Sequence, residues 1–445
     1  MSYSDTIFAL ASAPGRAGVS VLRVSGPHAS ESLAALSAAP IEPRVASLRR
    51  LKTPVSRETI DKALVLYFPN PASYTGEDLV EYHLHGGRAV INSMMDYLRG
   101  CNGHRMAEPG EFTRRAFENG KMDLTEAEAV ADLIDAETQA QKTQALAQAG
   151  GALSDLYEGW TSRLKTMLAH IEADIEFPDE DMPDGILPVL LPKIKALHLE
   201  IDAHLNDNRR GERLRDGVKI VIIGAPNAGK SSLLNVLAQR DAAIVSDMAG
   251  TTRDIIDVHL DLQGYPVIVS DTAGLRPEQL SDNAHDQIEG EGIKRALALA
   301  EHADIKLLLF DASSEAPDKG TLTLLDENSF VVVNKVDKRH PKFSIDQGLQ
   351  ISVKNGDGLD NLIESLARRI ENLVGLQESP ALTRERHRVA LRETHNNLLR
   401  GISNPIAELC AEDLRLAVRS LGRITGRVDV EDLLDVIFRD FCIGK

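Results

Sequence analysis

One loop constrains the fold of this chain more than any other segment. Residues 224–231 read GAPNAGKS and match the pattern G-x-x-x-x-G-K-[ST], between an apolar run, VKIVII, and a segment with helical spacing, SSLLNVLAQ. In this setting the glycines let backbone N–H groups surround a phosphate at the N-terminus of a helix. The sequence therefore predicts a strand–loop–helix unit in which Lys230 reaches the β- and γ-phosphates of a nucleotide and Ser231 binds magnesium.

Further apolar runs follow this loop at intervals, namely PVIVSD, IKLLLFD, FVVVNK and LQISVK. Near-continuous apolar runs of this kind are typical of strands that are buried on both faces of a mostly parallel sheet. We therefore expect residues 216–376 to form an α/β domain around the loop.

Motifs downstream of the loop indicate which nucleotide is bound. Thr252 in GTTRD would complete the magnesium shell, while Asp271 and Gly274 in DTAG would support the magnesium ion and bind the γ-phosphate. Asp337 in NKVD can accept hydrogen bonds from N1–H and the exocyclic amine of guanine, a pair of donors that adenine lacks. SVK at 352–354 follows where a loop behind the base belongs. The motifs together predict a guanine-nucleotide site and argue against a chance match of the first loop.

The residue after the DTAG motif is Leu275, where familiar GTP switches carry a glutamine that orients the attacking water. A leucine cannot orient water, so either GTP is bound without hydrolysis or other groups handle the water and the charge. Arg276 could supply charge or could be a solvated loop side chain. Asn227 could place an amide oxygen beside the β- and γ-phosphates and hold a potassium ion there.

The rest of the chain falls into segments that differ in their hydrophobic pattern and predicted secondary structure. Residues 1–118 mix short β-type runs with proline and glycine and one or two helices, which predicts a small α/β domain. Residues 119–215 and 377–445 have helical spacing, and Thr125 and Glu128 fit a capping box. An α/β unit between two helical stretches suggests an insertion into one helical domain.

Composition and charge exclude several classes of protein. The chain has 445 residues, of which 43% are hydrophobic and 26% charged, as is typical of a soluble multidomain protein. A net charge of −17 argues against a generic nucleic-acid coat. The 3 cysteines lie far apart, which fits a reducing cytoplasm. No signal peptide is expected, because the start, MSYSDTIFALASAPG, lacks a basic segment before its short apolar patch. No membrane span is expected, because no apolar run approaches about 20 residues.

Beyond the nucleotide motifs, the chain resembles the tRNA-modification GTPase family called MnmE or TrmE. The resemblance covers the whole chain and rests on GRAGVSVLRVSG, YTGEDLVEYHLHGG, PGEFTRRAFENGKMDLTEAEAVADLIDA, RDGVKIVIIGAPNAGKSSLLN and the terminal FCIGK. It implies a multidomain fold of α/β and all-α parts. An N-terminal α/β domain (1–118) would dimerise and bind folate, and a discontinuous helical domain (119–215 and 377–445) would carry an inserted Ras-like P-loop G domain (216–376).

For the G domain, the resemblance implies potassium-dependent hydrolysis that becomes competent when two G domains meet. The potassium ligands would be Asn227, Ser246, Met248 and Thr251, and the magnesium ligands Ser231 and Thr252. Glu289 in IEGEGI would orient the water, with Glu291 as the alternative. The positions expected to contact GTP are Asn227, Ala228, Gly229, Lys230, Ser231, Ser232, Ser246, Asp247, Met248, Ala249, Gly250, Thr251, Thr252, Asp271, Thr272, Ala273, Gly274, Asn334, Lys335, Val336, Asp337, Ser352, Val353 and Lys354.

For the first domain, the resemblance implies binding of 5,10-methylenetetrahydrofolate or a related tetrahydrofolate as one-carbon donor. The matching positions are Arg23, Glu81, Lys121 and the terminal Lys445. A carboxylate can pair with the N–H edge of the pterin, and basic groups can pair with the glutamate of folate. Cys442 in the tail would contribute to the modification site or would simply pack as a small apolar residue.

The resemblance also implies that the activity is shared with a partner. A homodimer of this chain would form a heterotetramer or larger complex with a protein of the MnmG (GidA) family that uses FAD and NADH. Together they would add a carboxymethylaminomethyl-type group to carbon 5 of the wobble uridine of certain tRNAs, held largely by the partner, with no membrane involved. The alternative class is a regulatory or ribosome-assembly GTPase that acts as a binding switch, which should lack the N-terminal motifs and CIGK.

Overall fold

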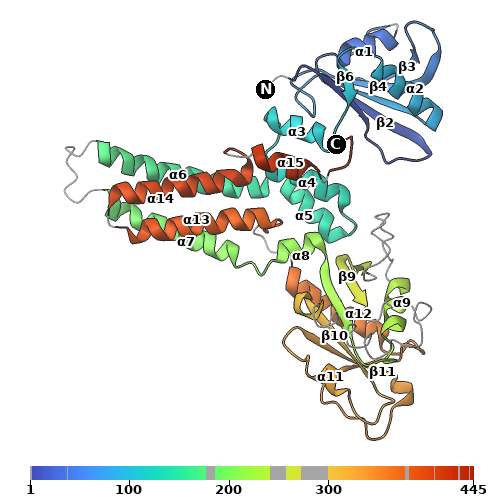
Figure 1. Ribbon diagram of the computed structural model, residues 1–445, viewed down its shortest axis with the longest axis vertical. Coiled ribbons are helices and arrows are strands. Elements are labelled where there is room, and N and C mark those ends of the chain that lie inside the picture. The colour runs from blue at the N-terminus through green and yellow to red at the C-terminus, as the bar shows by residue number, and fades with distance from the viewer. Residues whose placement is uncertain are drawn as a thin grey trace, which may run out of the picture. The chain divides into compact units, whose positions relative to one another are not determined.

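The computed structural model places most of the chain (Figure 1). The described residues are 3–37, 39–176, 186–240, 257–271, 299–375, 380–404, 406–428, 431–439 and 441–444. They divide into two compact units, of which the first comprises Met1–Ala131, Gln148–Glu176 and Ala411–Lys445 and the second Asp132–Ala147 and Phe177–Cys410. Each unit contains its own sheet.

The sheet of the first unit has six strands in the order β3-β4-β5-β2-β1-β6. Its strands are β1 (Thr6–Leu10), β2 (Ala17–Ser25), β3 (Ser47–Lys52), β4 (Thr59–Phe68), β5 (Leu79–Gly86) and β6 (His104–Met106). Neighbouring strands run antiparallel except for β1 and β6, which are parallel. The short apolar runs of this region therefore do form strands, as the sequence predicted.

One face of this sheet is covered by helices α1 (Ala29–Leu36) and α2 (Arg88–Arg99). Phe8 of β1 and Leu22 of β2 are fully buried in the core beneath them. Because side chains alternate along a strand, the neighbours of these residues point to the opposite face.

The opposite face carries a third helix, α3 (Glu111–Glu118), where one or two helices were expected in this region. Ile7 of β1 packs there against Phe112 of α3. The sequence of α3, EFTRRAFE, is mostly polar, and Arg115 is among its buried residues. Apolar periodicity could not reveal this helix, because charged side chains occupy part of its buried face.

Helices α4 (Leu124–Asp135), α5 (Gln139–Ala149) and α6 (Ala152–Glu176) precede the second sheet in the chain, and helices α14 (Ala407–Thr425) and α15 (Glu431–Arg439) follow it. In the first unit α6 and α14 lie side by side, and Arg415 of α14 pairs with Glu172 of α6 at 2.7 Å (Figure 1). Phe438 of α15 packs against Leu124 of α4. The chain was expected to be helical up to its last residue, but α15 ends at Arg439.

The capping box of α4 lies two residues earlier than the sequence analysis predicted. The Oδ1 of Asp123 accepts a hydrogen bond from the backbone N–H of Glu126 (2.9 Å), and the Oε2 of Glu126 accepts one from the N–H of Asp123 (2.8 Å). Thr125 and Glu128 are instead buried inside the helix. Asp123 and Glu126 have the same spacing as Thr125 and Glu128, and only the structure shows which pair caps the helix.

The sheet of the second unit has six strands in the order β12-β11-β10-β7-β9-β8. They are β7 (Val218–Ile223), β8 (Asp257–Leu262), β9 (Tyr265–Asp271), β10 (Ile305–Asp311), β11 (Ser329–Asn334) and β12 (Leu349–Gln350). All neighbours are parallel except β8, which is antiparallel to β9. The mostly parallel sheet confirms the prediction, although the edge strand β12 is only 2 residues long.

Both faces of this sheet are covered. Ile220 and Ile222 of β7 are buried with residues of α8 (Arg210–Asp216), α9 (Lys230–Arg240) and α12 (Leu359–Val374). On the opposite face lie a second buried cluster, which includes Val221 and Phe343, and the short helix α11 (Lys319–Leu322). Burial on two faces explains why these strands read as continuous apolar runs.

Two helices of the second unit, α7 (Leu187–Leu205) and α13 (Glu385–Ser403), pack along each other. At the end of this pair the buried Arg388 of α13 contacts Asp207 at 2.8 Å and Glu212 of α8 at 2.9 Å. Since α8 leads directly into β7, this ionic contact fixes the point at which the chain enters the second sheet. Breaking it would leave an unpaired charge in a buried position.

Candidate functional site

The loop between β7 and α9 lies at the carboxyl end of an inner strand of the second sheet. Asn227 and Gly229 have left-handed backbone angles, with φ of 61° and 101°. The Nζ of Lys230, the first residue of α9, donates hydrogen bonds to the carbonyl oxygens of Gly224 (2.9 Å) and Ala225 (3.0 Å). The ammonium group thus lies over the loop at a helix N-terminus, where backbone N–H groups and the helix dipole favour an anion.

The side chain of Asn334 ties this loop to the loop that follows β12. Asn334 is the last residue of β11 and is 2% exposed. Its Nδ2 donates to the carbonyl oxygen of Ala228 (2.8 Å), and its Oδ1 accepts a hydrogen bond from the N–H of Val353 (3.1 Å). A Cβ atom on Gly229 would lie 2.4 Å from this Nδ2. The buried amide is therefore satisfied on both sides, and only glycine fits against it.

The NKVD and SVK motifs meet at the same edge of the sheet. The hydroxyl of Ser352 donates to Oδ1 of Asp337 (2.7 Å), which orients an exposed carboxylate. The Nζ of Lys335 donates to Asp311 at the end of β10 (2.7 Å). Burial would raise the pKa of Asp311, but hydrogen bonds from Lys335 and Ser313 hold this pKa below its usual value. The exposed carboxylate of Asp337 can accept further hydrogen bonds at this edge of the sheet.

Other predicted contact residues have a described position near the loop. Ser231 and Ser232 lie in the first turn of α9, Val336 begins a short 3-10 helix with Asp337, and Lys354 follows Val353 in a turn. Asp271 ends β9. The remaining predicted residues lie outside the described residues, namely Ser246, Asp247, Met248, Ala249, Gly250, Thr251, Thr252, Thr272, Ala273, Gly274, Glu289, Glu291 and Lys445.

A second group of predicted residues meets in the first unit. Arg23 and Glu81 lie opposite each other on the neighbouring strands β2 and β5. The Nη2 of Arg23 donates to Oε1 of Glu81 at 2.9 Å, and the two side chains are 20% and 18% exposed. The guanidinium carbon of Arg23 lies 5.2 Å from the ring centre of Tyr74 and 5.7 Å from that of Phe112. One carboxylate and two rings thus hold a single cation.

Lys121 and the C-terminal segment reach the first domain from other parts of the chain. The Nζ of Lys121 donates to the carbonyl oxygen of Pro71 (3.1 Å), in the loop that also carries Tyr74. The N–H of Gly110 donates to the carbonyl oxygen of Cys442 (3.4 Å), whose side chain is exposed. A Cβ atom on Gly444 would lie 2.2 Å from the carbonyl oxygen of Leu10 at the end of β1. The tail therefore lies close against the first domain.

Tyr74 and Phe112 are the residues of this second group that the sequence analysis did not identify. Both lie inside motifs that it used, YTGED and PGEF. An aromatic residue within such a motif could have been flagged as a candidate contact. That both rings face Arg23 depends on the packing of a loop and a helix on one sheet face, which no local pattern reveals.

Two family models match this chain. The model described as GTP-binding protein TrmE N-terminus matches residues 6–121, and the model described as MnmE helical domain matches residues 124–442. The tRNA modification GTPase MnmE of Parvibaculum lavamentivorans is 53% identical, over 99% of this chain and 100% of the relative. The one from Paramagnetospirillum magneticum is also 53% identical with the same coverage, and one from Rickettsia bellii is 47% identical.

Solved structures that resemble part of the chain include the G domain of the T. maritima FeoB iron transporter. It is 22% identical and covers 34% of this chain and 97% of its own, with a TM-score of 0.24.

The fold and the site define a P-loop GTPase with a TrmE-type α/β domain, a discontinuous helical domain and an inserted G domain. The chain belongs to the MnmE family of tRNA modification GTPases and is a GTP hydrolase. This membership sets aside the alternative of a GTPase that acts only as a regulatory switch. Within the described ranges, no helix has the length and apolar character that crossing a bilayer requires.

The fit of Gly229 against Asn334 generates a prediction. Gly229→Ala should weaken GTP binding by about tenfold or more, because the added methyl group must displace the Asn334 amide and the backbone angle disfavours alanine. Titration with a fluorescent GTP analogue measures the change. Gly264→Ala is the matched control, since Gly264 also has a positive φ of 92° but nothing lies within 4 Å of its added Cβ. Unchanged affinity in Gly229→Ala would contradict the account of the loop.

Proposed function

We propose that this chain is the potassium-dependent GTP hydrolase of a two-protein system that adds a carboxymethylaminomethyl-type group to carbon 5 of the wobble uridine in certain tRNAs. A partner of the MnmG (GidA) type would supply FAD and NADH. The observation that carries the modification role is the Arg23–Glu81 pair with its two flanking rings. A GTPase that acts only as a switch does not need such a group of residues in a separate domain.

The G domain binds and orients GTP in this proposal. The N–H groups of residues 224–231 and the ammonium of Lys230 hold the phosphates, and the carboxylate of Asp337 accepts hydrogen bonds from guanine. Ser231 and Thr252 hold magnesium, which neutralises charge on the phosphates, and Asp271 supports it. Glu289 orients the water that Leu275 cannot orient.

Potassium would supply the positive charge that an arginine supplies in other GTPases. The proposed ligands are Asn227, Ser246, Met248 and Thr251. Asn227 fits this role because its side chain is exposed at the tip of the phosphate loop and its amide oxygen is a hard-cation ligand. The backbone φ of Asn227 is 61°, a left-handed angle that asparagine tolerates better than most residues.

The first domain binds a tetrahydrofolate as one-carbon donor in this proposal. The residues fit such a ligand, because Glu81 offers carboxylate oxygens to a pterin N–H edge while Tyr74 and Phe112 offer ring faces beside it. Arg23, Lys121 and Lys445 would provide cationic groups for the glutamate of folate. Cys442 lies near enough in sequence to the docked Gly444 to enter the same site or to pack beside it.

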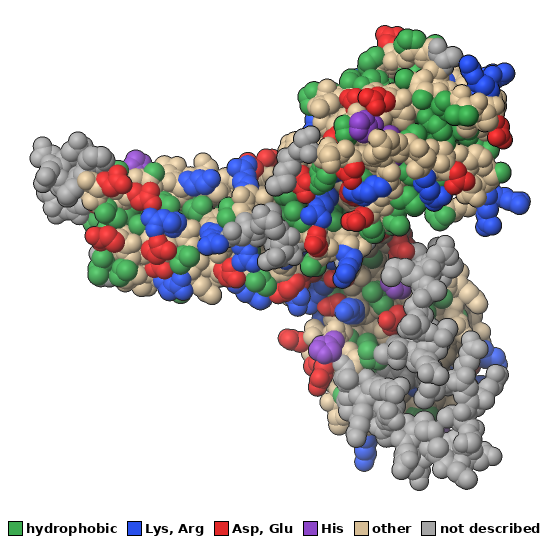
Figure 2. All heavy atoms as spheres, turned by 45° about the horizontal axis from the view of Figure 1, so that its top comes forward, with side chains coloured by type: hydrophobic (Ala, Val, Ile, Leu, Met, Phe, Trp, Pro, Cys, Tyr) green, Lys and Arg blue, Asp and Glu red, His purple; other side chains and the backbone are tan. Residues whose placement is uncertain are grey.

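The proposed assembly includes a homodimer, the MnmG-type partner and tRNA, in the cytoplasm. Leu48, Leu64 and Val19 are exposed apolar residues of the first sheet, and such a surface supports self-association of the first domain. Acidic and basic side chains are intermixed on the face shown in Figure 2, and the net charge is −17. Both features favour a tRNA held mainly by the partner.

The modification role predicts a loss that can be measured in tRNA. In a strain that lacks this chain, mass spectrometry of digested tRNA should show loss of the carboxymethylaminomethyl group at wobble uridines. The wild-type chain should restore it, whereas Glu81→Gln should fail to restore it and still hydrolyse GTP, because Glu81 lies in the first domain. Normal modification in the deleted strain would contradict the proposal.

The potassium role predicts dependence on the alkali metal. GTP turnover should fall by at least about tenfold when sodium replaces potassium at constant ionic strength, since positive charge at the transferring phosphate contributes about 10³-fold or more elsewhere. Asn227→Gly keeps the positive φ and removes the amide, so it should abolish this preference while GTP affinity remains. Equal turnover of the wild-type chain in the two salts would remove potassium from the mechanism.

A further inference from the structure

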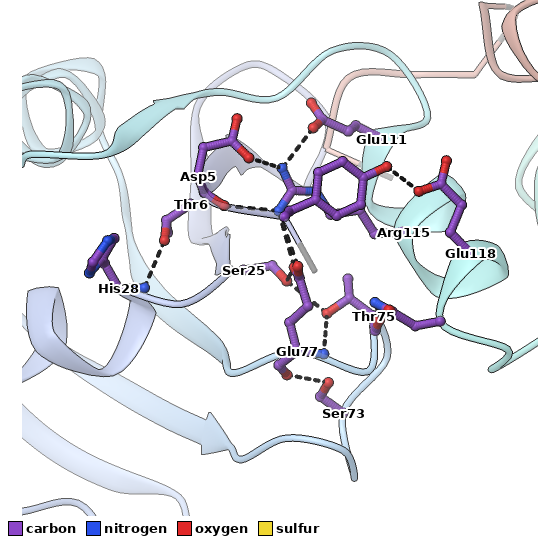
Figure 3. Close-up of polar contacts among 12 residues, drawn as sticks. Asp5, Thr6, Ser25, His28, Ser73, Thr75, Glu77, Glu111, Arg115 and Glu118 are labelled. Atoms are coloured by element: carbon purple, nitrogen blue, oxygen red, sulfur yellow. Dashed lines mark hydrogen bonds and ion pairs between the residues drawn. The ribbon is translucent and has the colours of Figure 1, made fainter. Parts of the chain in front are cut away.

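A buried arginine in the first unit contacts three carboxylates. Arg115 of α3 is 0% exposed, and its guanidinium lies 2.9 Å from Asp5, 3.2 Å from Glu77 and 2.9 Å from Glu111 (Figure 3). Asp5 precedes β1, Glu77 lies in the loop between β4 and β5, and Glu111 begins α3. One side chain therefore connects the segment before β1, a loop and a helix.

Pairing makes this arrangement rigid. Arg105 adds a second guanidinium, at 2.6 Å from Asp5 and 2.5 Å from Glu111. Burial would raise the pKa of Glu111, but hydrogen bonds from Arg105 and Arg115 lower it, so the carboxylate stays charged. Arg115 and Glu111 are both buried, so separating either of them from its charged partners would leave an unpaired buried charge, which is strongly unfavourable.

The group holds the loop of residues 69–78 against α3. Three side-chain contacts join the two segments, and we call them the loop–helix tie: Arg115 to Glu77 (3.2 Å), Tyr74 to Thr113 (2.9 Å) and Asn119 to the carbonyl oxygen of Thr75 (2.8 Å). Ser25 at the end of β2 also donates to Glu77 (2.9 Å), which anchors the loop to the sheet (Figure 3). The loop is therefore fixed at both its middle and its end.

The loop–helix tie determines how the two rings stand beside Arg23. Tyr74 comes from the loop and Phe112 from α3, and each lies within 6 Å of the Arg23 guanidinium, at 5.2 Å and 5.7 Å. If the loop moved away from α3, the two rings would separate and Arg23 would keep its bond to Glu81 but lose its contact with Tyr74. The rings and the Arg23–Glu81 pair would then no longer present one fixed arrangement to a ligand.

We propose that Arg115 is a positioning residue for the one-carbon donor: through the loop–helix tie it holds the rings of Tyr74 and Phe112 beside Arg23. This inference rests on the proposed binding of a tetrahydrofolate in the first domain. Arg115 itself is fully buried and acts on the ligand only through these other residues. Its substitution should therefore change affinity for the donor and leave GTP turnover unchanged.

The experiment compares tetrahydrofolate affinity among variants of the full chain by isothermal titration. Arg115→Met removes the centre of the tie. Arg114→Met is the matched control, since Arg114 is the preceding residue on α3 and pairs with Glu118 and Asp435 outside the tie. Because Arg115→Met could impair folding, Thr113→Val provides a second variant, which removes the partner of Tyr74 without burying a charge. Thr113→Ser restores a hydroxyl at the same position.

We expect Arg115→Met and Thr113→Val to weaken tetrahydrofolate binding by about tenfold or more, as misplacement of a positioning group does elsewhere. Arg114→Met and Thr113→Ser should bind as the wild type does, and all folded variants should hydrolyse GTP normally. Wild-type affinity in Thr113→Val would overturn the positioning role and leave the proposed function standing. A wild-type chain that does not bind tetrahydrofolate would overturn both. A purely structural role would lower the melting temperature of Thr113→Val without this selective loss of affinity.

Discussion

The buried side chain of Asn334 is the contact on which the nucleotide site of this protein depends. Parallel strands deliver the phosphate loop and the base-reading loops to one edge of the sheet, but strand order alone does not set their spacing. The amide does so, because it donates to Ala228 of one loop and accepts from Val353 of another. Since the amide is buried, losing either bond would leave a polar group unsatisfied. The requirement for glycine at position 229 follows from the same contact.

The first domain uses the same physical device with charged groups. Arg115 is buried among carboxylates from a loop, a helix and the segment before β1, and the buried charges of Arg115 and Glu111 are stable only while they are paired. In both units a buried polar side chain fixes loops that short-range sequence preferences would leave free. The proposed GTP and folate sites therefore have rigid supports, while Arg23 and Asp337 remain accessible enough to meet a ligand.

The sequence predicted the inner strands of the second sheet well, because burial on two faces produces continuous apolar runs such as IKLLLFD. It predicted β12 less well. The run LQISVK looks like the others, but only its first 2 residues form a strand, at the edge of the sheet. The sequence predicted one or two helices in the first domain where its described residues form three, and α3 is hard to recognise because Arg115 and Glu111 occupy its buried face. The predicted capping box at Thr125 and Glu128 was wrong. Asp123 and Glu126 have the same spacing, and they form the capping box at the start of α4.

In the candidate sites, too, local sequence patterns identified some residues and missed others. Motifs with fixed spacing made Lys230, Asn334 and Asp337 candidates, because residues expected to contact one phosphate or one base lie within a few positions of each other in each motif. Tyr74, Phe112 and Arg115 escaped notice because their roles come from contacts between segments far apart in the chain. Such contacts depend on how a loop and a helix pack on a sheet, and no pattern along the sequence encodes that packing locally.

The central claim is that the carboxylate of Asp337 reads guanine at a site held in register by Asn334. Asp337→Asn tests it most directly, because an asparagine can accept from N1–H but must donate where the carboxylate accepted from the exocyclic amine. Xanthine carries an oxygen at that position. Competition binding should show that the affinity of this variant for GTP falls by a factor of about 10² or more and that its affinity for xanthosine triphosphate rises. If Asp337→Asn keeps its preference for GTP, the assignment of this carboxylate to the base is wrong.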